Sequence, residues 1–155
     1  MLGLSSEQFL KQAACDAITG DINQYPITWG AKPFRDAIAA KYKRHYDLEF
    51  DPEREVTVCC GATECMIATL MAVTNPGDEV IIPAPFWLSY PEMVKLAGAT
   101  PVIVPTSEAN GFKITPEQFR DAMTPATKLI ILNSPGNPTG SVYSAEELKA
   151  LAEVA

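Results

Sequence analysis

The sequence predicts an α/β fold in which strands pair in parallel. Short apolar segments alternate with helical patterns from residue 55 to the end of the chain. Strands that alternate with helices usually pair in parallel, through right-handed crossovers. The segment 129–132 is a continuous apolar run, which is typical of a strand covered on both faces.

The first part of the chain predicts two helices joined by a connector. Residues 6–19 carry an apolar stripe at helical spacing, with Ser6 as N-cap and Gly20 at the end. Residues 21–30 form a polar and aromatic connector, and a second helix is expected from Pro33 to Tyr46. One face of this helix is apolar. The charged residues lie on the opposite face, which we expect to be solvated: Lys32, Arg35, Asp36, Lys43 and Arg44.

The remainder of the chain predicts alternating strands and helices. We expect strands at 55–60, 79–82, 100–104 and 128–132. We expect helices at 62–74, 88–97 and 115–123, and another from residue 144. Thr115 and Ser144 are each followed three residues later by Gln118 or Glu147, a spacing that predicts a capping box at the start of both helices.

Composition narrows the possible functions. The chain has 155 residues, the size of one ordinary domain, and its hydrophobic content of 47% is sufficient for a core. A net charge of −7 argues against a protein that binds nucleic acid. We find neither an apolar run long enough to span a membrane nor the pattern of a signal peptide, and we expect a cytoplasmic protein.

The four cysteines do not predict a metal site. Cys15, Cys59, Cys60 and Cys65 include no C-x-x-C pair, so we expect no zinc and no other bound metal. Reduced, packed thiols are the expected state of these residues.

Polar turns follow three of the predicted strands. Gly61, Ala62 and Thr63 lead from a strand into a helix, whose first N–H groups and dipole favour an anion. Trp87 follows a second strand, and the segment 134–140, SPGNPTG, follows a third. Open α/β sheets bind ligands at the carboxyl ends of their strands, so these turns are the candidate site.

The segment 133–140, NSPGNPTG, resembles the Asn-Pro-Thr-Gly signature of the class I/II aminotransferases, which are fold-type-I enzymes that use pyridoxal 5′-phosphate (PLP). Three segments that resemble other signatures of this aspartate-aminotransferase-like family precede it in the expected order: QYPITWG, CCGAT and PAPFW. The resemblance implies a three-layer α/β/α fold with a mostly parallel sheet. It also implies that residues 1–30 are an N-terminal helix and connector, and that residues 31–155 are part of a large PLP-binding domain truncated at both ends.

The resemblance also implies roles for individual residues. Gly61, Ala62 and Thr63 would hold the PLP phosphate, and Trp87 would stack on the pyridine ring. Asn137 would donate a hydrogen bond to the phenolic oxygen. In a homodimer, Tyr25 would reach the phosphate bound by the partner subunit. The same resemblance implies cis peptide bonds before Pro85 and Pro138.

Each of these residues also has a structural interpretation. Thr63 could cap its helix, and Trp87 could be a core residue beneath the next helix. The Asn137 side chain could fix an Asx turn. Tyr25 could pack in a local cluster with Trp29.

The resemblance implies the transfer of an amino group between an amino acid and a 2-oxo acid. Transfer requires a lysine that forms a Schiff base with PLP. None of the eight lysines has the setting of that residue, so we assign no catalytic residue and expect the chain alone to be inactive. Two alternatives remain open: another fold-type-I PLP enzyme, such as a β-lyase or decarboxylase, or a non-catalytic module that binds a phosphate or nucleotide.

Overall fold

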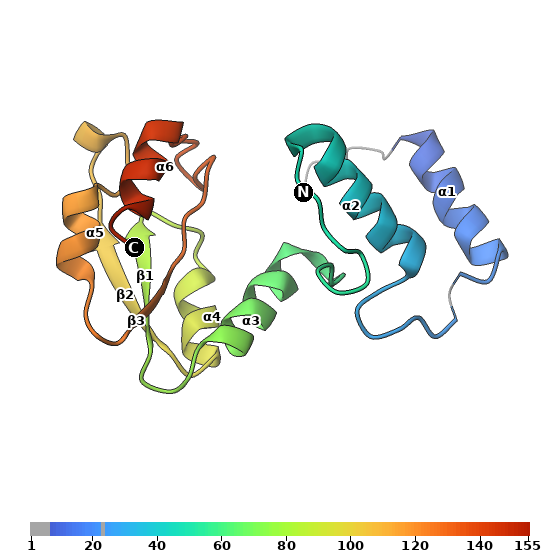
Figure 1. Ribbon diagram of the computed structural model, residues 1–155, viewed down its shortest axis with the longest axis horizontal. Helices are drawn as coiled ribbons and strands as arrows, with labels where there is room; N and C mark the ends of the chain where they lie inside the picture. Colours follow the sequence, from blue (N-terminus) through green and yellow to red (C-terminus); the bar gives the residue numbers. More distant parts are fainter. Residues whose placement is uncertain (1–6, 23) are drawn as a thin grey trace. The chain divides into compact units, whose positions relative to one another are not determined.

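The computed structural model describes residues 7–22 and 24–155, and the chain divides into two compact units. The first unit is Met1–Cys60 and the second is Gly61–Ala155. Figure 1 traces both units along the sequence. The boundary expected at residue 30 concerns the domains of a larger fold, and it stays a prediction.

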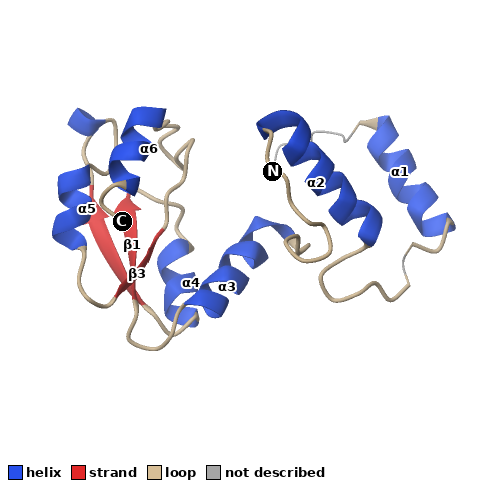
Figure 2. Ribbon diagram, viewed as in Figure 1, coloured by secondary structure: helices blue, strands red, loops and turns tan. Residues whose placement is uncertain are grey.

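The second unit contains a parallel sheet of three strands. Its strands are β1 (Glu79–Ala84), β2 (Thr100–Pro105) and β3 (Thr127–Ile130), in the order β2-β1-β3. Both neighbours run parallel to β1, so the predicted parallel pairing is confirmed. Figure 2 shows the three strands with helices around them.

Helices cover both faces of this sheet. They are α3 (Gly61–Val73), α4 (Tyr90–Leu96), α5 (Pro116–Ala122) and α6 (Ala145–Ala152). Val80 and Ile82 of β1 belong to a core cluster with residues of α3 and α4. Ile81 belongs to a second cluster with residues of α5 and α6. Because successive strand residues point to opposite faces, the sheet lies between two helical layers, and the predicted three-layer α/β/α fold is confirmed (Figure 1).

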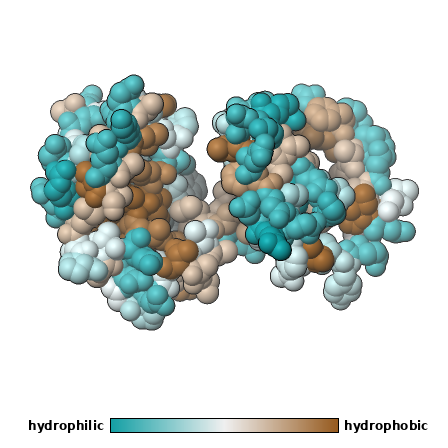
Figure 3. Space-filling model, in the orientation of Figure 1, coloured by the Kyte–Doolittle hydropathy of each residue, from teal (hydrophilic) through white to brown (hydrophobic). Residues whose placement is uncertain are grey.

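The apolar run at 129–132 packs on both faces, as predicted, but it is less buried than the central strand. Leu129 and Ile131 contact the cluster of α3 and α4, and Ile130 contacts the other cluster. All three are half-buried, because β3 is an edge strand, whereas Val80 to Ile82 of β1 have no exposed surface. Large apolar side chains also remain on the surface, and Figure 3 shows apolar surface on both units.

The first unit contains α1 (Gln8–Thr19) and α2 (Lys32–Tyr46). The predicted cap at Ser6 lies outside the described residues. The prediction that Arg35 is solvated is wrong, because its side chain is 1% exposed and is the buried side chain of α2. Its guanidinium donates to the carbonyl oxygens of Gly30 and Pro52 and pairs with the carboxylate of Glu53. These acceptors satisfy the charged group away from water.

The strand expected at 55–60 also needs correction. The segment 55–60 forms no strand in the described part of the chain, although Val56 is buried and Val58 N–H donates to Trp29 O at 3.0 Å. A strand requires a hydrogen-bonded neighbouring strand, and Trp29, the backbone partner of Val58, lies in a turn of the connector. Between β2 and α5 the chain also forms a short 3₁₀ helix, Glu108–Asn110.

The prediction of packed cysteines is also mostly wrong. Cys15, Cys60 and Cys65 are exposed, and only Cys59 is half-buried. Across residues 7–22 and 24–155, each helix is too short or too polar to cross a bilayer.

Candidate functional site

The first turn of the site follows β1. Thr106 fixes the end of this strand, because its backbone N–H donates to Ala84 O at 3.1 Å and its hydroxyl donates to the same oxygen. The Ala84–Pro85 peptide bond is cis, and the chain then leads to Trp87. The predicted cis bond before Pro85 is therefore confirmed.

The second turn follows β3 and carries Asn137. Its backbone is closed by hydrogen bonds from Gly136 N–H to Ser141 O and from Gly140 N–H to Gly136 O, both 2.7 Å long. The predicted cis bond between Asn137 and Pro138 is confirmed. A third cis bond, between Ser134 and Pro135, was not predicted. The result is a tight loop with a defined shape.

The third turn is the start of α3. Gly61 has a φ of +83°, a left-handed conformation that favours glycine over other residues. Ala62 and Thr63 follow within the helix and are exposed. Because Thr63 is the third residue of α3, it does not occupy the N-cap position, and that alternative is wrong.

The three turns meet at one cavity of about 170 Å³. The residues that line it are Ala62, Thr63, Met66, Trp87, Tyr90, Met93 and Asn137. The structure thus brings together four of the predicted site residues from three separate turns, and Gly61 lies next to them in the chain. This convergence is the main geometric finding at the carboxyl edge of the sheet.

The exposure of Trp87 and the hydrogen bonding of Asn137 argue against the structural interpretations of these two residues. Trp87 is 45% exposed, so it is not a core residue beneath α4. Among the described residues, the Asn137 side chain has no hydrogen-bond partner, so no bond supports the Asx-turn interpretation. Both groups are therefore available to a ligand.

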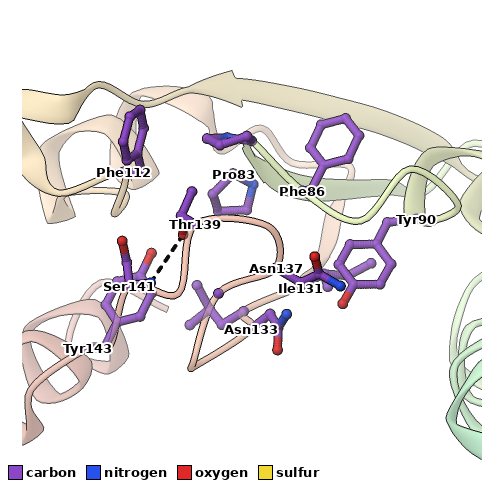
Figure 4. A pocket seen from close by; sticks show the side chains of 13 residues that line it. Pro83, Phe86, Tyr90, Phe112, Ile131, Asn133, Asn137, Thr139, Ser141 and Tyr143 are labelled. Atoms are coloured by element: carbon purple, nitrogen blue, oxygen red, sulfur yellow. Dashed lines mark hydrogen bonds between the residues drawn. The ribbon is translucent and has the colours of Figure 1, made fainter. Parts of the chain in front are cut away.

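A second, smaller cavity lies beneath the Asn137 loop. It shares Tyr90 and Asn137 with the first cavity and is also lined by Phe112, Thr139 and Tyr143, among others. Figure 4 shows Asn137 beside Tyr90, with Thr139 and Ser141 on the same loop joined by a hydrogen bond. Asn137 therefore lines both cavities.

Tyr25 belongs to the first unit and is fully exposed. It does not pack with Trp29, so that alternative is wrong. Trp29 instead faces the guanidinium of Arg35, which lies 6.0 Å from its ring centroid. The role of Tyr25 in a dimer stays a prediction.

Sequence reasoning missed three residues of the cavity: Met66, Tyr90 and Met93. Met66 follows Ala62 and Thr63 by about one helical turn, so helical spacing could have placed it on the same face. Tyr90 stands three residues after Trp87, at the start of α4, and its backbone N–H donates to Trp87 O at 3.0 Å. No comparable signal marks Met93.

The chemistry of the cavity is neutral and partly aromatic. Its polar groups are the hydroxyls of Thr63 and Tyr90, the amide of Asn137 and the indole N–H of Trp87, and no charged side chain of the described residues lines it. Beside the second cavity, burial raises the pKa of Tyr143 above its ordinary value, so that residue is protonated at neutral pH. A flat ring with an anionic substituent fits this set of donors beside a tryptophan.

Comparison with known proteins places these features in a family. The family model described as aminotransferase class I and II matches residues 2–155. The aspartate aminotransferase of Geobacillus stearothermophilus is 47% identical over 150 residues, which are 97% of this chain and 38% of that protein. The probable N-succinyldiaminopimelate aminotransferase of Mycobacterium tuberculosis is 48% identical over 145 residues, 93% of this chain and 36% of that protein.

Solved structures show the same relationship. The aspartate aminotransferase of Rhizobium meliloti superimposes with a TM-score of 0.92 and 37% identity, over 98% of this chain and 38% of that one. The aromatic aminotransferase of Pyrococcus horikoshii superimposes with a TM-score of 0.93 and 35% identity, over 97% of this chain and 40% of that one. The chain thus spans less than two fifths of the length of the two curated relatives.

Proposed function

Because the chain belongs to the class I and II aminotransferase family, we propose that it forms part of the PLP site of an aminotransferase. The whole enzyme would transfer an amino group between an amino acid and a 2-oxo acid. The observation that carries this proposal is the single cavity lined by Ala62, Thr63, Trp87 and Asn137.

The residues of the cavity fit the parts of PLP. The hydroxyl of Thr63 and the first N–H groups of α3 would hold the phosphate, next to the left-handed turn at Gly61. The exposed face of Trp87 offers a flat apolar surface for the ring. The amide of Asn137 can donate to the phenolic oxygen.

When bound, PLP supplies an aldehyde and an electron-withdrawing ring that stabilises negative charge at the α-carbon of an amino acid. The residues of this chain would bind and orient that ring. Asn137 would stabilise the ionised form of the phenolic oxygen, and Trp87 would keep water from one ring face. None of the eight lysines lines the cavity, so the lysine that takes part in the chemistry would come from outside this chain.

Further parts of the proposal concern the whole protein. Tyr25 would reach the phosphate of a partner subunit in a homodimer, and the enzyme would act in amino acid metabolism in the cytoplasm. The relatives are named for different substrates, among them aspartate and N-succinyldiaminopimelate. We therefore propose the reaction class and leave the amino acid open.

The proposal is tested on the full-length protein that contains this chain, purified with PLP. We expect a protein-bound absorbance band of the cofactor that borohydride treatment removes. With an amino acid added as donor, we also expect an added 2-oxo acid to be converted to its amino acid. Release of carbon dioxide, or of ammonia with loss of a side-chain substituent, would instead indicate the decarboxylase or β-lyase alternative. Absence of the band, together with binding of ADP that Thr63→Val weakens, would contradict PLP chemistry and favour a nucleotide-binding module.

A further inference from the structure

The loop that carries Asn137 is tied to a distant segment of the chain, residues 111–114, between β2 and α5. The Ser141 hydroxyl donates to Gly111 O. The Tyr143 hydroxyl oxygen accepts a hydrogen bond from Ile114 N–H at 3.0 Å. The ammonium group of Lys113 pairs with the carboxylate of Glu147. These contacts connect the 111–114 segment with residues 141–147, which follow Asn137 in the chain.

Tyr143 stands at the centre of these contacts. Tyr143 is 9% exposed and belongs to the core cluster that contains Ile81 of β1. Its backbone N–H donates to the Ser134 hydroxyl at 3.1 Å, which joins the end of the loop to its beginning. One residue thus connects the core, the 111–114 segment and both ends of the loop.

Lys113 adds to the same connection. Its ammonium lies 3.4 Å from Val142 O and 5.8 Å from the centroid of the Tyr143 ring. Figure 4 shows Tyr143 and Ser141 on one side of the smaller cavity and Asn137 on the other. Five residues separate Asn137 from Tyr143 in the chain, so the contacts of Tyr143 lie close to the loop that presents Asn137.

We propose that Tyr143 is a positioning residue for Asn137 and acts by fastening the Asn137 loop to the 111–114 segment. This inference rests on the proposed function, in which the Asn137 side chain donates a hydrogen bond to the phenolic oxygen of PLP. The competing explanation is that Tyr143 contributes to the core alone, with no specific effect on the loop.

Hydrogen exchange of the 155-residue chain tests the fastening without any ligand. Tyr143→Phe removes the acceptor of Ile114 N–H and keeps the ring. We expect about tenfold faster exchange at the amides of Gly136 and Gly140, because local opening of the loop becomes easier. Tyr46→Phe makes the same chemical change at an exposed tyrosine and serves as the control. Ser141→Ala removes a different contact, so it gives a second reading if Tyr143→Phe fails to fold.

A ligand experiment tests the link to Asn137. The probe is 4-deoxypyridoxine 5′-phosphate, which has the phenolic oxygen but no aldehyde that could react with lysines. Tyr143→Phe should weaken its binding about three- to tenfold, the size of one hydrogen bond. Binding of an analogue without the phenolic oxygen should be unchanged. In the double variant Tyr143→Phe with Asn137→Ala, binding should be no weaker than with Asn137→Ala alone.

The outcomes separate this inference from the proposed function. Unchanged exchange at Gly136 and Gly140 in a folded Tyr143→Phe chain would overturn it, and if that variant does not fold, unchanged exchange in Ser141→Ala would do so. So would equal weakening of both analogues by Tyr143→Phe. If the parent chain binds neither analogue, the proposed cofactor site is contradicted, while the exchange comparison still decides whether Tyr143 fastens the loop.

Discussion

At the scale of single residues, Arg35 shows how a charged side chain becomes part of an interior. Its guanidinium has two backbone carbonyl acceptors and a carboxylate partner, and its side chain is almost fully buried. Helical periodicity predicted that Arg35 lies on the solvated face, because this method uses only the charge and spacing of residues within the helix. It cannot detect a partner that lies elsewhere in the chain. Pro52 and Glu53, which supply two of its partners, lie outside the helix.

Replacing Arg35 should destabilise the first unit. Arg35→Met leaves the Gly30 and Pro52 carbonyls without their donor, and we expect a loss of about 2–4 kcal/mol in the free energy of unfolding. Arg44→Met, at an exposed position of the same helix, is the matched control and should cost less than about 0.5 kcal/mol. Urea unfolding measures both, and equal effects of the two substitutions would contradict this account of Arg35.

Gly136 is required by close packing within the Asn137 loop. A Cβ at this position would lie 2.8 Å from the Thr139 hydroxyl oxygen. Gly136→Ala should therefore cost about 1–3 kcal/mol in stability. Adding Thr139→Ala removes the clashing atom, so the double variant should be more stable than the sum of the single effects predicts. Strict additivity in thermal or urea unfolding would show that the clash is not the cause.

At the scale of elements, the helix starts were predictable and one strand was not. Capping boxes depend on residues three apart, and both are formed: Thr115 with Gln118, and Ser144 with Glu147. The strand expected at 55–60 depends on a neighbour that local sequence does not reveal. The loop after β3 shows the same contrast between local and distant features. Its turn residues could be predicted from the local sequence, whereas its contacts with residues 111–114 could not.

Removing a capping side chain should weaken the helix that it begins. Ser144→Ala should destabilise the second unit by about 1 kcal/mol, because the N–H of Glu147 loses its acceptor. Ser107→Ala is the control, since Ser107 stands at the N-cap of the short 3₁₀ helix without a side-chain cap bond. We expect a lower unfolding midpoint for the first variant only. A similar fall in both would mean that the capping bond does not stabilise α6.

The contact between Lys113 and Glu147 should make stability depend on acid. The hydrogen bond from Lys113 lowers the pKa of Glu147, and the Ser144 backbone N–H adds to this effect. A lowered pKa means that the stabilisation is fully present above the ordinary glutamate value of about 4.3 and is lost as the pH falls through the lower folded value.

Unfolding midpoints of the parent and of Lys113→Met should therefore differ at neutral pH and converge once the pH falls below the lowered pKa of Glu147. Glu147→Gln keeps a side chain that can accept a hydrogen bond but cannot titrate, and it should abolish the pH dependence of the Lys113 effect. A difference between parent and Lys113→Met that persists unchanged into acid would contradict this contribution.

At the scale of the whole molecule, the family resemblance predicted more of the fold and of the site than the periodicity of helices and strands could. Periodicity predicts strands and helices, but the order β2-β1-β3 and the two helical layers depend on contacts between distant segments. The family resemblance placed Thr63, Trp87 and Asn137 in one site, and the structure gathers them around one cavity. The resemblance gave no role to Tyr90, which lines the same cavity.

The chain alone should have no aminotransferase activity. It brings no lysine to the cavity, so added PLP would be bound without the group that transfers protons during the reaction. An assay with the chain, PLP, an amino acid and a 2-oxo acid should give the same rate as PLP without protein. Turnover that rises in proportion to the concentration of the chain would refute this.

The central claim is that three separate turns form one binding site for a phosphorylated ring. The most direct measurement is titration of the Trp29→Phe chain with 4-deoxypyridoxine 5′-phosphate, because Trp87 is then the single tryptophan and reports binding by its fluorescence. We expect saturable quenching that Thr63→Val and Asn137→Ala each weaken severalfold. Quenching that is absent, or that neither substitution weakens, would contradict the claim.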